Sequence, residues 1–159
     1  MTEPLTSIDL QAFIDQEKVA ADIVTLDAPT PTVAAAAAVL GVQAEQIVKS
    51  VLFMADGQPL LVVASGEARV DGKKLADWLG IARRRVRVAN GEKVLRYTGF
   101  VPGSVPPFGH LSQLETVVET AVLTQSVVFG GGGDLNALMQ LTVDELQRVV
   151  GFKTATLRL

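Results

Sequence analysis

The chain has 159 residues, of which 48% are hydrophobic and 19% charged, and its formal net charge is −3 at pH 7. This length and composition predict one globular domain over residues 1–159 and exclude a largely disordered chain. The absence of cysteine excludes disulfides, thiolate nucleophiles and cysteine-based metal sites. No signal-like segment opens the chain and no apolar run approaches the ~18 residues of a membrane span. We therefore expect a soluble, cytoplasmic protein with no membrane partner.

Hydrophobic periodicity and capping residues define the elements expected in the first half of the chain. These are helices over residues 8–20, 33–40 and 71–79, and strands over residues 22–26, 48–54, 59–64 and 86–89. Ser7 and Thr32 are the expected N-terminal caps of the first two helices, and Gly41 and Gly80 end the second and third. Asp56-Gly57 is a hairpin signal, in a loop slightly longer than two residues.

Shorter elements and more turns are expected in the second half. They are a helix over residues 91–98, a glycine- and proline-rich loop over 100–110, strand-like runs over 116–118, 121–123, 126–129 and 137–141, and an edge strand over 154–157. Between the last two, Thr142 caps a helix that Gly151 ends, and Glu145 completes a capping box. Strands outnumber helices and no βαβ repeat occurs. The expected fold is therefore α/β of the α+β type, with a mixed, largely antiparallel sheet flanked by helices.

Positive charge gathers between Gly66 and Tyr97, in a segment with nine of the 14 lysines and arginines and four acidic residues. That segment carries +5 and the rest of the chain −8. A polyanion could bind there through contacts that weaken with salt, although a solvated helix face is the favoured interpretation of charge alone. The candidate contacts are Arg69, Lys73, Lys74, Arg84 and Arg85.

Lys49 lies on an expected strand whose other residues on the same side, Ile47, Val51 and Phe53, are apolar. An ammonium group there costs free energy unless water or a partner reaches it. A lysine that snorkels from the strand end is the explanation favoured by the pattern. The alternative is a cation at a pocket floor that meets a carbonyl or phosphate oxygen. Ser50 points to the opposite side, where a structural role is favoured.

The loop from Gly103 to His110 combines prolines, which fix φ, with glycines, which permit close approach of the main chain to a ligand. It could hold backbone N–H groups toward one point, as an oxyanion requires, and a plain structural turn is an equal alternative. His110 is the only histidine. A general base is conceivable, but no carboxylate or nucleophile lies at a recognisable spacing. A packed or surface histidine is therefore favoured.

Four glycines, Gly130–Gly133, precede Asp134. They could form an anion-binding nest, but they do not match a dinucleotide fingerprint, and a flexible hairpin loop is the favoured interpretation. No His, Asp and Glu cluster has metal-ligand spacing, and no serine sits in a nucleophile elbow. We therefore expect neither a metal nor another cofactor.

Together these segments resemble the YbaK/EbsC family of aminoacyl-tRNA deacylases, which is related to the editing domain of bacterial prolyl-tRNA synthetases. The resemblance runs through residues 22–151, and its motifs are fairly specific in their order and spacing. The motifs are Thr32–Gly41, Gln46–Phe53, Arg69–Ala76 and Thr98–Gly109. The family implies a curved, barrel-like sheet, Lys49 as the essential lysine, and a Gly103–Pro107 loop whose main chain orients the aminoacyl carbonyl of the 3′-terminal adenosine.

The resemblance implies an enzyme that hydrolyses, in trans, the ester between a small mischarged amino acid and tRNA. Neither a metal nor a side-chain nucleophile is required, because the substrate's ribose hydroxyl or side chain can assist water. The substrate-contacting set is then Ser50, Ser104, Pro107, Gly109, Gly133 and Asp134. The tRNA acceptor stem is the partner for the basic segment, and an aminoacyl-tRNA synthetase is a further partner left open.

Two departures from the family pattern leave the preferred amino acid open among Cys, Ala, Ser and Thr. Ser104 stands where many members have a second glycine, and Gly130–Asp134 does not match the commoner basic loop. Two other functions also remain open. One is a non-catalytic tRNA-binding or regulatory module of the same fold, and the other is a hydrolase of another small ester or amide.

Overall fold

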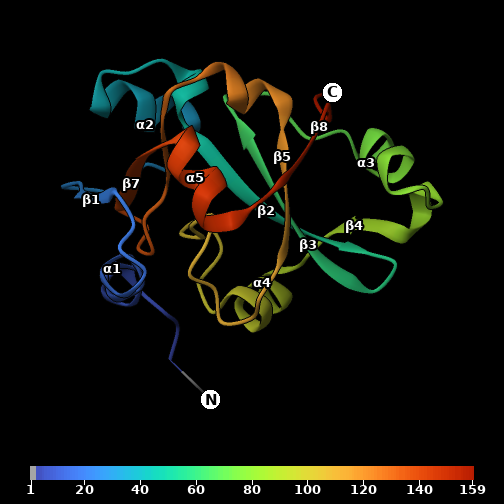
Figure 1. The fold of residues 1–159 in the computed structure, drawn as a ribbon, viewed down its shortest axis with the longest axis horizontal. Helices are drawn as coiled ribbons and strands as arrows, with labels where there is room; N and C mark the ends of the chain where they lie inside the picture. Colours follow the sequence, from blue (N-terminus) through green and yellow to red (C-terminus); the bar gives the residue numbers. More distant parts are fainter. Residues whose placement is uncertain (1–2) are drawn as a thin grey trace.

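The computed structural model describes residues 3–159 and contains two β-sheets with helices around them (Figure 1). The smaller sheet is antiparallel, in the order β1 (Ala21–Thr25), β7 (Ala137–Thr142) and β6 (Val127–Gly131). The larger sheet has the order β4 (Val86–Val88), β2 (Val48–Ala55), β3 (Gln58–Ser65), β5 (Glu115–Glu119) and β8 (Lys153–Ala155). Its β4–β2 and β2–β3 pairs are antiparallel, and its β3–β5 and β5–β8 pairs are parallel.

The expected mixed, largely antiparallel fold is confirmed, but the expected barrel-like closure is wrong. Over residues 3–159 the two sheets remain separate, and a single parallel bridge between Ile47 and Phe129 links them. In this bridge, Ile47 lies just before β2 and Phe129 lies in β6. The two strands therefore approach each other at this point and separate beyond it. The cavity described below lies at this separation.

Five α-helices and three short 3₁₀ helices lie within the described residues. The α-helices are α1 (Ser7–Gln16), α2 (Val33–Leu40), α3 (Gly72–Leu79), α4 (Gly91–Thr98) and α5 (Val143–Val150). The 3₁₀ helices are η1 (Ala44–Gln46), η2 (Arg83–Arg85) and η3 (Thr120–Thr124), so the strand expected over 121–123 is wrong. None of these helices has the length and apolar character needed to cross a membrane.

The caps of α2 and α3 follow the sequence closely. Thr32 accepts from the Ala35 amide at 3.0 Å, and Gly41 ends α2 in the left-handed conformation at φ 69°. Asp71 and Gly80 serve α3 in the same way. The expected roles of Thr32, Gly41 and Gly80 are therefore confirmed, whereas Asp71, expected within the third helix, is its N-cap.

The predicted start and end of α1 are wrong. Thr6, not Ser7, is the cap, because its hydroxyl accepts from the Ile8 amide while Asp9 accepts from the Thr6 amide. The helix ends at Gln16 rather than at residue 20, since Lys18 takes a positive φ of 53°.

The hairpin between β2 and β3 turns through Asp56 and Gly57 alone, since Ala55 pairs with Gln58. Both turn residues have positive φ, 50° and 78°, as a two-residue turn that follows the twist of the strands requires. The expected longer loop is therefore wrong. Pairing runs along the whole of β2 and fixes which residues share a face.

Alternate residues of β2 enter two different apolar layers. Val48, Leu52 and Met54 pack in the main core with residues from α1, α5 and β7. Val51 and Phe53 pack on the opposite face beneath Leu75 of α3. By this alternation Ser50 belongs to the core face of β2, and Lys49 belongs to the face that α3 covers further along.

Candidate active site

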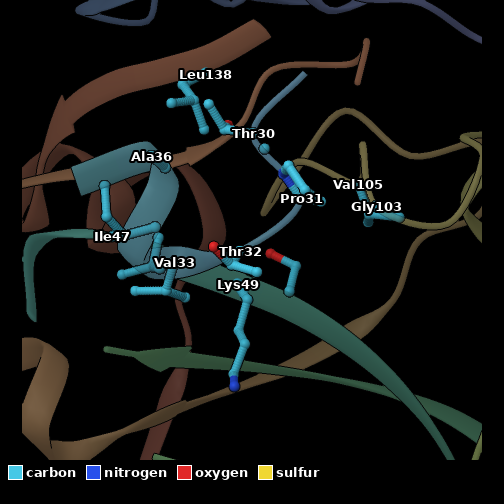
Figure 2. Close-up of a pocket in the computed structure, with 13 residues that line it drawn as sticks. Thr30, Pro31, Thr32, Val33, Ala36, Ile47, Lys49, Gly103, Val105 and Leu138 are labelled. Atoms are coloured by element: carbon cyan, nitrogen blue, oxygen red, sulfur yellow. The ribbon is translucent and has the colours of Figure 1, made fainter. Parts of the chain in front are cut away.

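A cavity of about 210 Å³ lies beside the first residues of β2, near the start of α2 (Figure 2). Its wall is largely apolar and includes Val33, Ala36, Ile47, Val48, Val105 and Leu138. Its polar lining comes from Thr30, Thr32 and Ser50, and its remaining lining residues are Pro31, Lys49, Gly103 and Gly131. The fold thus brings together three of the predicted site residues, Lys49, Ser50 and Gly103.

Ser50 supplies a polar group on the core side of β2. Its hydroxyl oxygen is buried and has no hydrogen-bond partner among residues 3–159. A buried hydroxyl without a partner costs about 1–3 kcal/mol, so such a group calls for a ligand or a water molecule. Because Ser50 also lines the cavity, a bound molecule there could supply the partner.

Lys49 is one of the residues that line the same cavity. Figure 2 shows its Nζ extending away from Pro31 and Gly103. The residue is half-buried, and within residues 3–159 its ammonium group makes no hydrogen bond or ion pair. The predicted cation is therefore present and unpaired, but it projects outside the cavity rather than from its floor.

Gly103 brings the glycine- and proline-rich loop to the cavity. It has φ 91°, a conformation that strains a residue with a side chain, and it is the third residue of a tight turn from Val101 to Ser104. The Val101 carbonyl accepts from both the amide and the hydroxyl of Ser104, at 3.1 and 2.8 Å. The Ser104 side chain is fully buried, and its hydroxyl group donates within the loop. It does not line the cavity.

Main chain packs directly on main chain where this loop meets β6. A Cβ atom added to Gly131 would lie 2.1 Å from the Val105 carbonyl oxygen. The Gly133 amide donates to the Ser104 carbonyl at 3.0 Å. The glycine run therefore holds the loop in place, and Gly131 itself lines the cavity.

Four other predicted site residues lie outside this cavity. Pro107 and Gly109 border a second cavity of about 380 Å³, together with residues of α1 and α5. Gly133 lies against the start of α1. Asp134 accepts a hydrogen bond from the Ser7 hydroxyl at 2.5 Å.

His110 is packed within the loop and lines the second cavity. Its Nε2 lies 2.6 Å from the Pro106 carbonyl oxygen, and its ring meets Phe100 edge-on. Desolvation by burial lowers the pKa of His110, and the hydrogen bond to Pro106 opposes this only in part. The ring is therefore neutral near pH 7, with Nε2–H as the donor. His110 is not among the residues that line the first cavity.

The predicted tRNA contacts lie on and around α3 and η2. Lys74 donates to the Arg158 carbonyl at 2.5 Å, and Arg85 pairs with Asp56 at 3.1 Å. Arg69, Lys73 and Arg84 are exposed and take part in no ion pair within the described chain. Arg83, absent from the predicted set, folds over Gly72 and donates to the Val86 carbonyl.

Across residues 3–159, no three His, Asp or Glu side chains gather as a metal site would require. The polar groups of the first cavity are hydroxyls and main-chain groups, and the Lys49 ammonium lies outside it. Such a set can hold an ester carbonyl, an ammonium or a phosphate oxygen.

The class of protein to which this two-sheet fold and its cavity belong follows from a comparison with known families. A model of the aminoacyl-tRNA editing domain matches residues 27–149, and the chain belongs to this family. The resemblance seen in the sequence is thus confirmed. All residues that line the first cavity fall inside the matched region.

Individual relatives carry the comparison further. The chain is 32% identical over 126 residues to the uncharacterized protein YwhH of Bacillus subtilis (strain 168), covering 79% of this chain and 78% of that protein. It is 35% identical over 86 residues to the proline–tRNA ligase of Nitratidesulfovibrio vulgaris (strain DP4), covering 52% of this chain but 15% of the ligase.

Two solved structures have nearly the same fold. One is a candidate trans-editing enzyme for prolyl-tRNA synthetase, with a TM-score of 0.89 and 31% identity over 96% of both chains. The other is the hypothetical protein APE2540, with a TM-score of 0.86 and 30% identity, covering 95% of this chain and 99% of that one.

Proposed function

We propose that this protein is a trans-editing hydrolase that cleaves the ester between a small amino acid and tRNA. The observation that carries the proposal is the cavity inside the editing-domain region. It contains one buried hydroxyl without a protein partner, and Lys49 and Gly103 border it. Family membership supplies the substrate class.

The cavity size supports a small aminoacyl group. Its volume of about 210 Å³ lies below the ~300–1,000 Å³ of pockets that enclose drug-sized ligands. Val33, Ala36 and Leu138 provide apolar walls for a short side chain. A separate editing enzyme adds discrimination between amino acids that a synthetase pocket lacks, because the pocket gains only about 1–3 kcal/mol from one methylene group.

The reaction needs no nucleophile from the protein. Water adds to the ester carbonyl carbon, the bond to the ribose oxygen breaks, and the water proton passes to that oxygen through the neighbouring ribose hydroxyl. The products are the free amino acid and tRNA. We assign the Gly103 main chain to the carbonyl oxygen, where a fixed N–H stabilises developing negative charge.

Lys49 and Ser50 take different parts in this proposal. The Ser50 hydroxyl contacts the aminoacyl group inside the cavity. The Lys49 ammonium lies outside it and attracts the phosphate and ester oxygens of the 3′ end, because its flexible stem allows a point charge to follow the substrate. No step requires a metal ion.

The basic residues around α3 extend the binding surface. Lys49 lies on the sheet face that α3 covers, and Arg69, Lys73 and Arg84 have no acidic partner within the described residues. We assign these exposed side chains to the phosphates of the tRNA acceptor stem, which predicts affinity that falls with salt.

The test is a panel of tRNAs charged with Cys, Ala, Ser, Thr or Pro, incubated with wild type, Lys49→Ala and Lys153→Ala. We expect Lys49→Ala to lower the rate constant for ester cleavage at least about 10²-fold, as loss of one charge-stabilising group does. Its circular dichroism spectrum should be unchanged. Lys153 is an exposed lysine of β8 outside the cavity lining, so its variant should match wild type.

Other outcomes of the panel would contradict the proposal. Full activity of Lys49→Ala would show that Lys49 does not have the role assigned to it. Binding of charged tRNA without cleavage across the panel would favour a non-catalytic module. Turnover of a small ester at the same rate without nucleic acid would favour a hydrolase of another class.

A further inference from the structure

Helix α1 lies outside the region that the editing-domain model matches, which begins at residue 27. It nevertheless packs against the glycine- and proline-rich loop and against the β6–β7 turn. Figure 1 shows α1 beside the chain that leads into β1, at the edge of the smaller sheet. Its buried residues Leu10 and Ile14 enter the main core, so the helix is part of the packed structure.

The first turn of α1 is fastened to the β6–β7 turn. The Ser7 hydroxyl donates to the Asp134 carboxylate at 2.5 Å, part-buried, and the Asp134 charge lies at the positive end of the helix. A Cβ atom on Gly133 would lie 2.7 Å from the Ser7 amide nitrogen, so the two main chains touch. The Gly133 amide in turn donates to the Ser104 carbonyl. One short path therefore joins Ser7 to the residue after Gly103.

The middle of α1 touches the far end of the same loop. The rings of Phe13 and Phe108 stack with centroids 5.4 Å apart. Leu10 and Phe13 both lie 3.4 Å from the position that a Cβ atom on Gly109 would take. The helix thus contacts the loop directly at one end and through Gly133 at the other.

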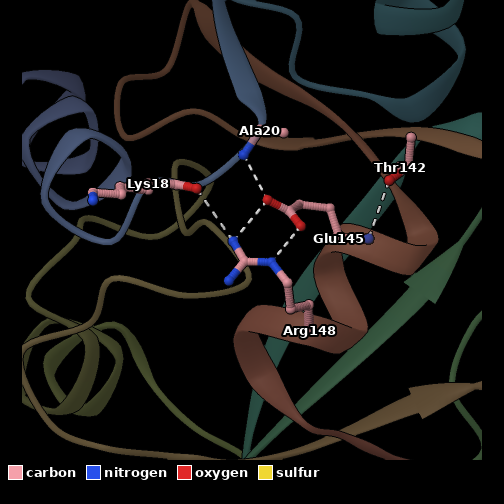
Figure 3. A network of polar contacts seen from close by, with 5 residues as sticks. All are labelled: Lys18, Ala20, Thr142, Glu145 and Arg148. Atoms are coloured by element: carbon pink, nitrogen blue, oxygen red, sulfur yellow. Dashed lines mark hydrogen bonds and ion pairs between the residues drawn. The ribbon is translucent and has the colours of Figure 1, made fainter.

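A network of polar contacts fixes the chain just after α1 (Figure 3). The Glu145 carboxylate of α5 accepts from the Ala20 amide at 2.6 Å. Arg148 donates to the Glu145 carboxylate and also to the Lys18 carbonyl, at 3.3 Å. Together with the Ser7–Asp134 bond, this network holds both ends of α1 on the body of the protein.

We infer that α1 is a positioning element for the active-site loop, and that the Ser7–Asp134 hydrogen bond sets the placement of Gly103. Neither residue touches the reacting ester. Backbone donors stabilise a transition state only when they are held at the right point before the reaction. Loosening the bond should therefore slow the chemical step more than it weakens substrate binding.

The experiment compares Ser7→Ala, Asp134→Ala and the double variant with wild type. The control is Thr6→Ala, which removes the helix cap and weakens α1 but leaves the Ser7–Asp134 bond in place. Each single variant should lower kcat about tenfold, with KM within about twofold, because a hydrogen bond to a charged group is lost. The double variant should fall no further, since both substitutions remove one interaction.

Hydrogen–deuterium exchange supplies a second readout that does not depend on catalysis. The loop amides between Gly103 and Gly109 should exchange about tenfold faster in Ser7→Ala and Asp134→Ala, and at the wild-type rate in Thr6→Ala. This inference rests on the proposed function for its kinetic readout alone. If wild type cleaves no charged tRNA, the proposed function fails, and exchange still decides whether α1 positions the loop.

Three results would overturn the inference. The first is unchanged loop exchange in Ser7→Ala. The second is equal acceleration in Thr6→Ala, which would assign the effect to general weakening of the helix. The third is a raised KM in Asp134→Ala but not in Ser7→Ala, which would place Asp134 on the substrate itself.

Discussion

Replacement of Gly131 by alanine tests the contact between β6 and the active-site loop. The added Cβ atom would lie 2.1 Å from the Val105 carbonyl oxygen and 2.6 Å from its carbonyl carbon. Ordinary contacts between such atoms are about 3.3–3.6 Å. Since the obstacle is main chain, the loop or the strand must move by roughly 1 Å. No rotamer change of a side chain can relieve the overlap.

The cost follows from this displacement. Extra methyl groups in packed regions cost about 1–3 kcal/mol, and a rigid obstacle places Gly131→Ala at the upper end, about 3 kcal/mol. For a domain of this size, 1 kcal/mol corresponds to about 2–4 °C in Tm. We therefore expect Tm to fall by about 6–12 °C. Because Gly131 lines the cavity, deacylation should fall as well.

The assay is urea unfolding followed by circular dichroism, with Gly72→Ala as the matched control. A Cβ atom on Gly72 would lie 2.6 Å from the Arg83 guanidinium, the far end of a flexible side chain that can move aside. The control should therefore stay within about 0.5 kcal/mol of wild type. Equal midpoints for Gly131→Ala and wild type would refute the close contact between strand and loop.

Three further predictions concern charge. Burial lowers the pKa of His110, so the unfolded chain binds a proton at this residue more readily than the folded chain does. The free energy of unfolding should therefore fall as pH drops below about 6.5. His110→Gln should flatten this fall in urea titrations between pH 7 and 5, and an equally steep fall would contradict the assignment. The hydrogen bond from Arg148 holds the pKa of Glu145 at about 2, so the associated stability is present above about 4.5 and is lost as pH falls toward 2. In an NMR titration, Arg148→Ala should raise the pKa of Glu145 toward 4.5, and an unchanged pKa would assign the shift to the Ala20 amide instead. Arg84→Glu should raise KM for charged tRNA and weaken its salt dependence, whereas Lys153→Glu on β8 should change neither.

The helix caps show which local features a sequence can predict. Thr32 and Gly41 bound α2 as expected, because a hydroxyl and a left-handed glycine act within one turn of the helix that they cap. Ser7 was the expected cap of α1, but its hydroxyl donates to Asp134, 127 residues away. Thr6 caps the helix instead. The pattern identified a helix start and missed the long-range partner that decides between two adjacent hydroxyl residues.

The same competition explains the capping box predicted for α5. Thr142 caps the helix as expected, through the Glu145 amide. The Glu145 side chain does not return to the Thr142 amide. It accepts instead from the Ala20 amide and from Arg148, and its side chain is only 13% exposed. A tertiary donor thus replaces the local one, so this part of the box is wrong.

For the candidate site, the sequence predicted the segments more reliably than the side chains. The strand with Lys49 and the loop with Gly103 do meet at one cavity. Pro107 and Gly109 follow Gly103 in the same loop but border the second cavity, with the Pro107 ring beside Gly130 of β6 and Gly109 against α1. Residues four to six positions apart in an irregular loop have no fixed relation in space, since no periodicity relates their directions. Their positions depend on tertiary packing, against β6 for Pro107 and against α1 for Gly109.

Lys49 and Ser50 illustrate the last step from pattern to site. Adjacent residues of a strand point to opposite faces, so the two side chains cannot both enter one cavity. The sequence placed the unusual polar group at Lys49, because an ammonium among Ile47, Val51 and Phe53 is costly. The structure relieves that cost, because Lys49 is only half-buried and its ammonium group points away from the other residues that line the cavity. The costly group is instead the Ser50 hydroxyl, buried without a partner on the core side. A bound aminoacyl group would therefore meet the Ser50 hydroxyl inside the cavity and the Lys49 charge outside it. This arrangement follows from the alternation of side chains along β2.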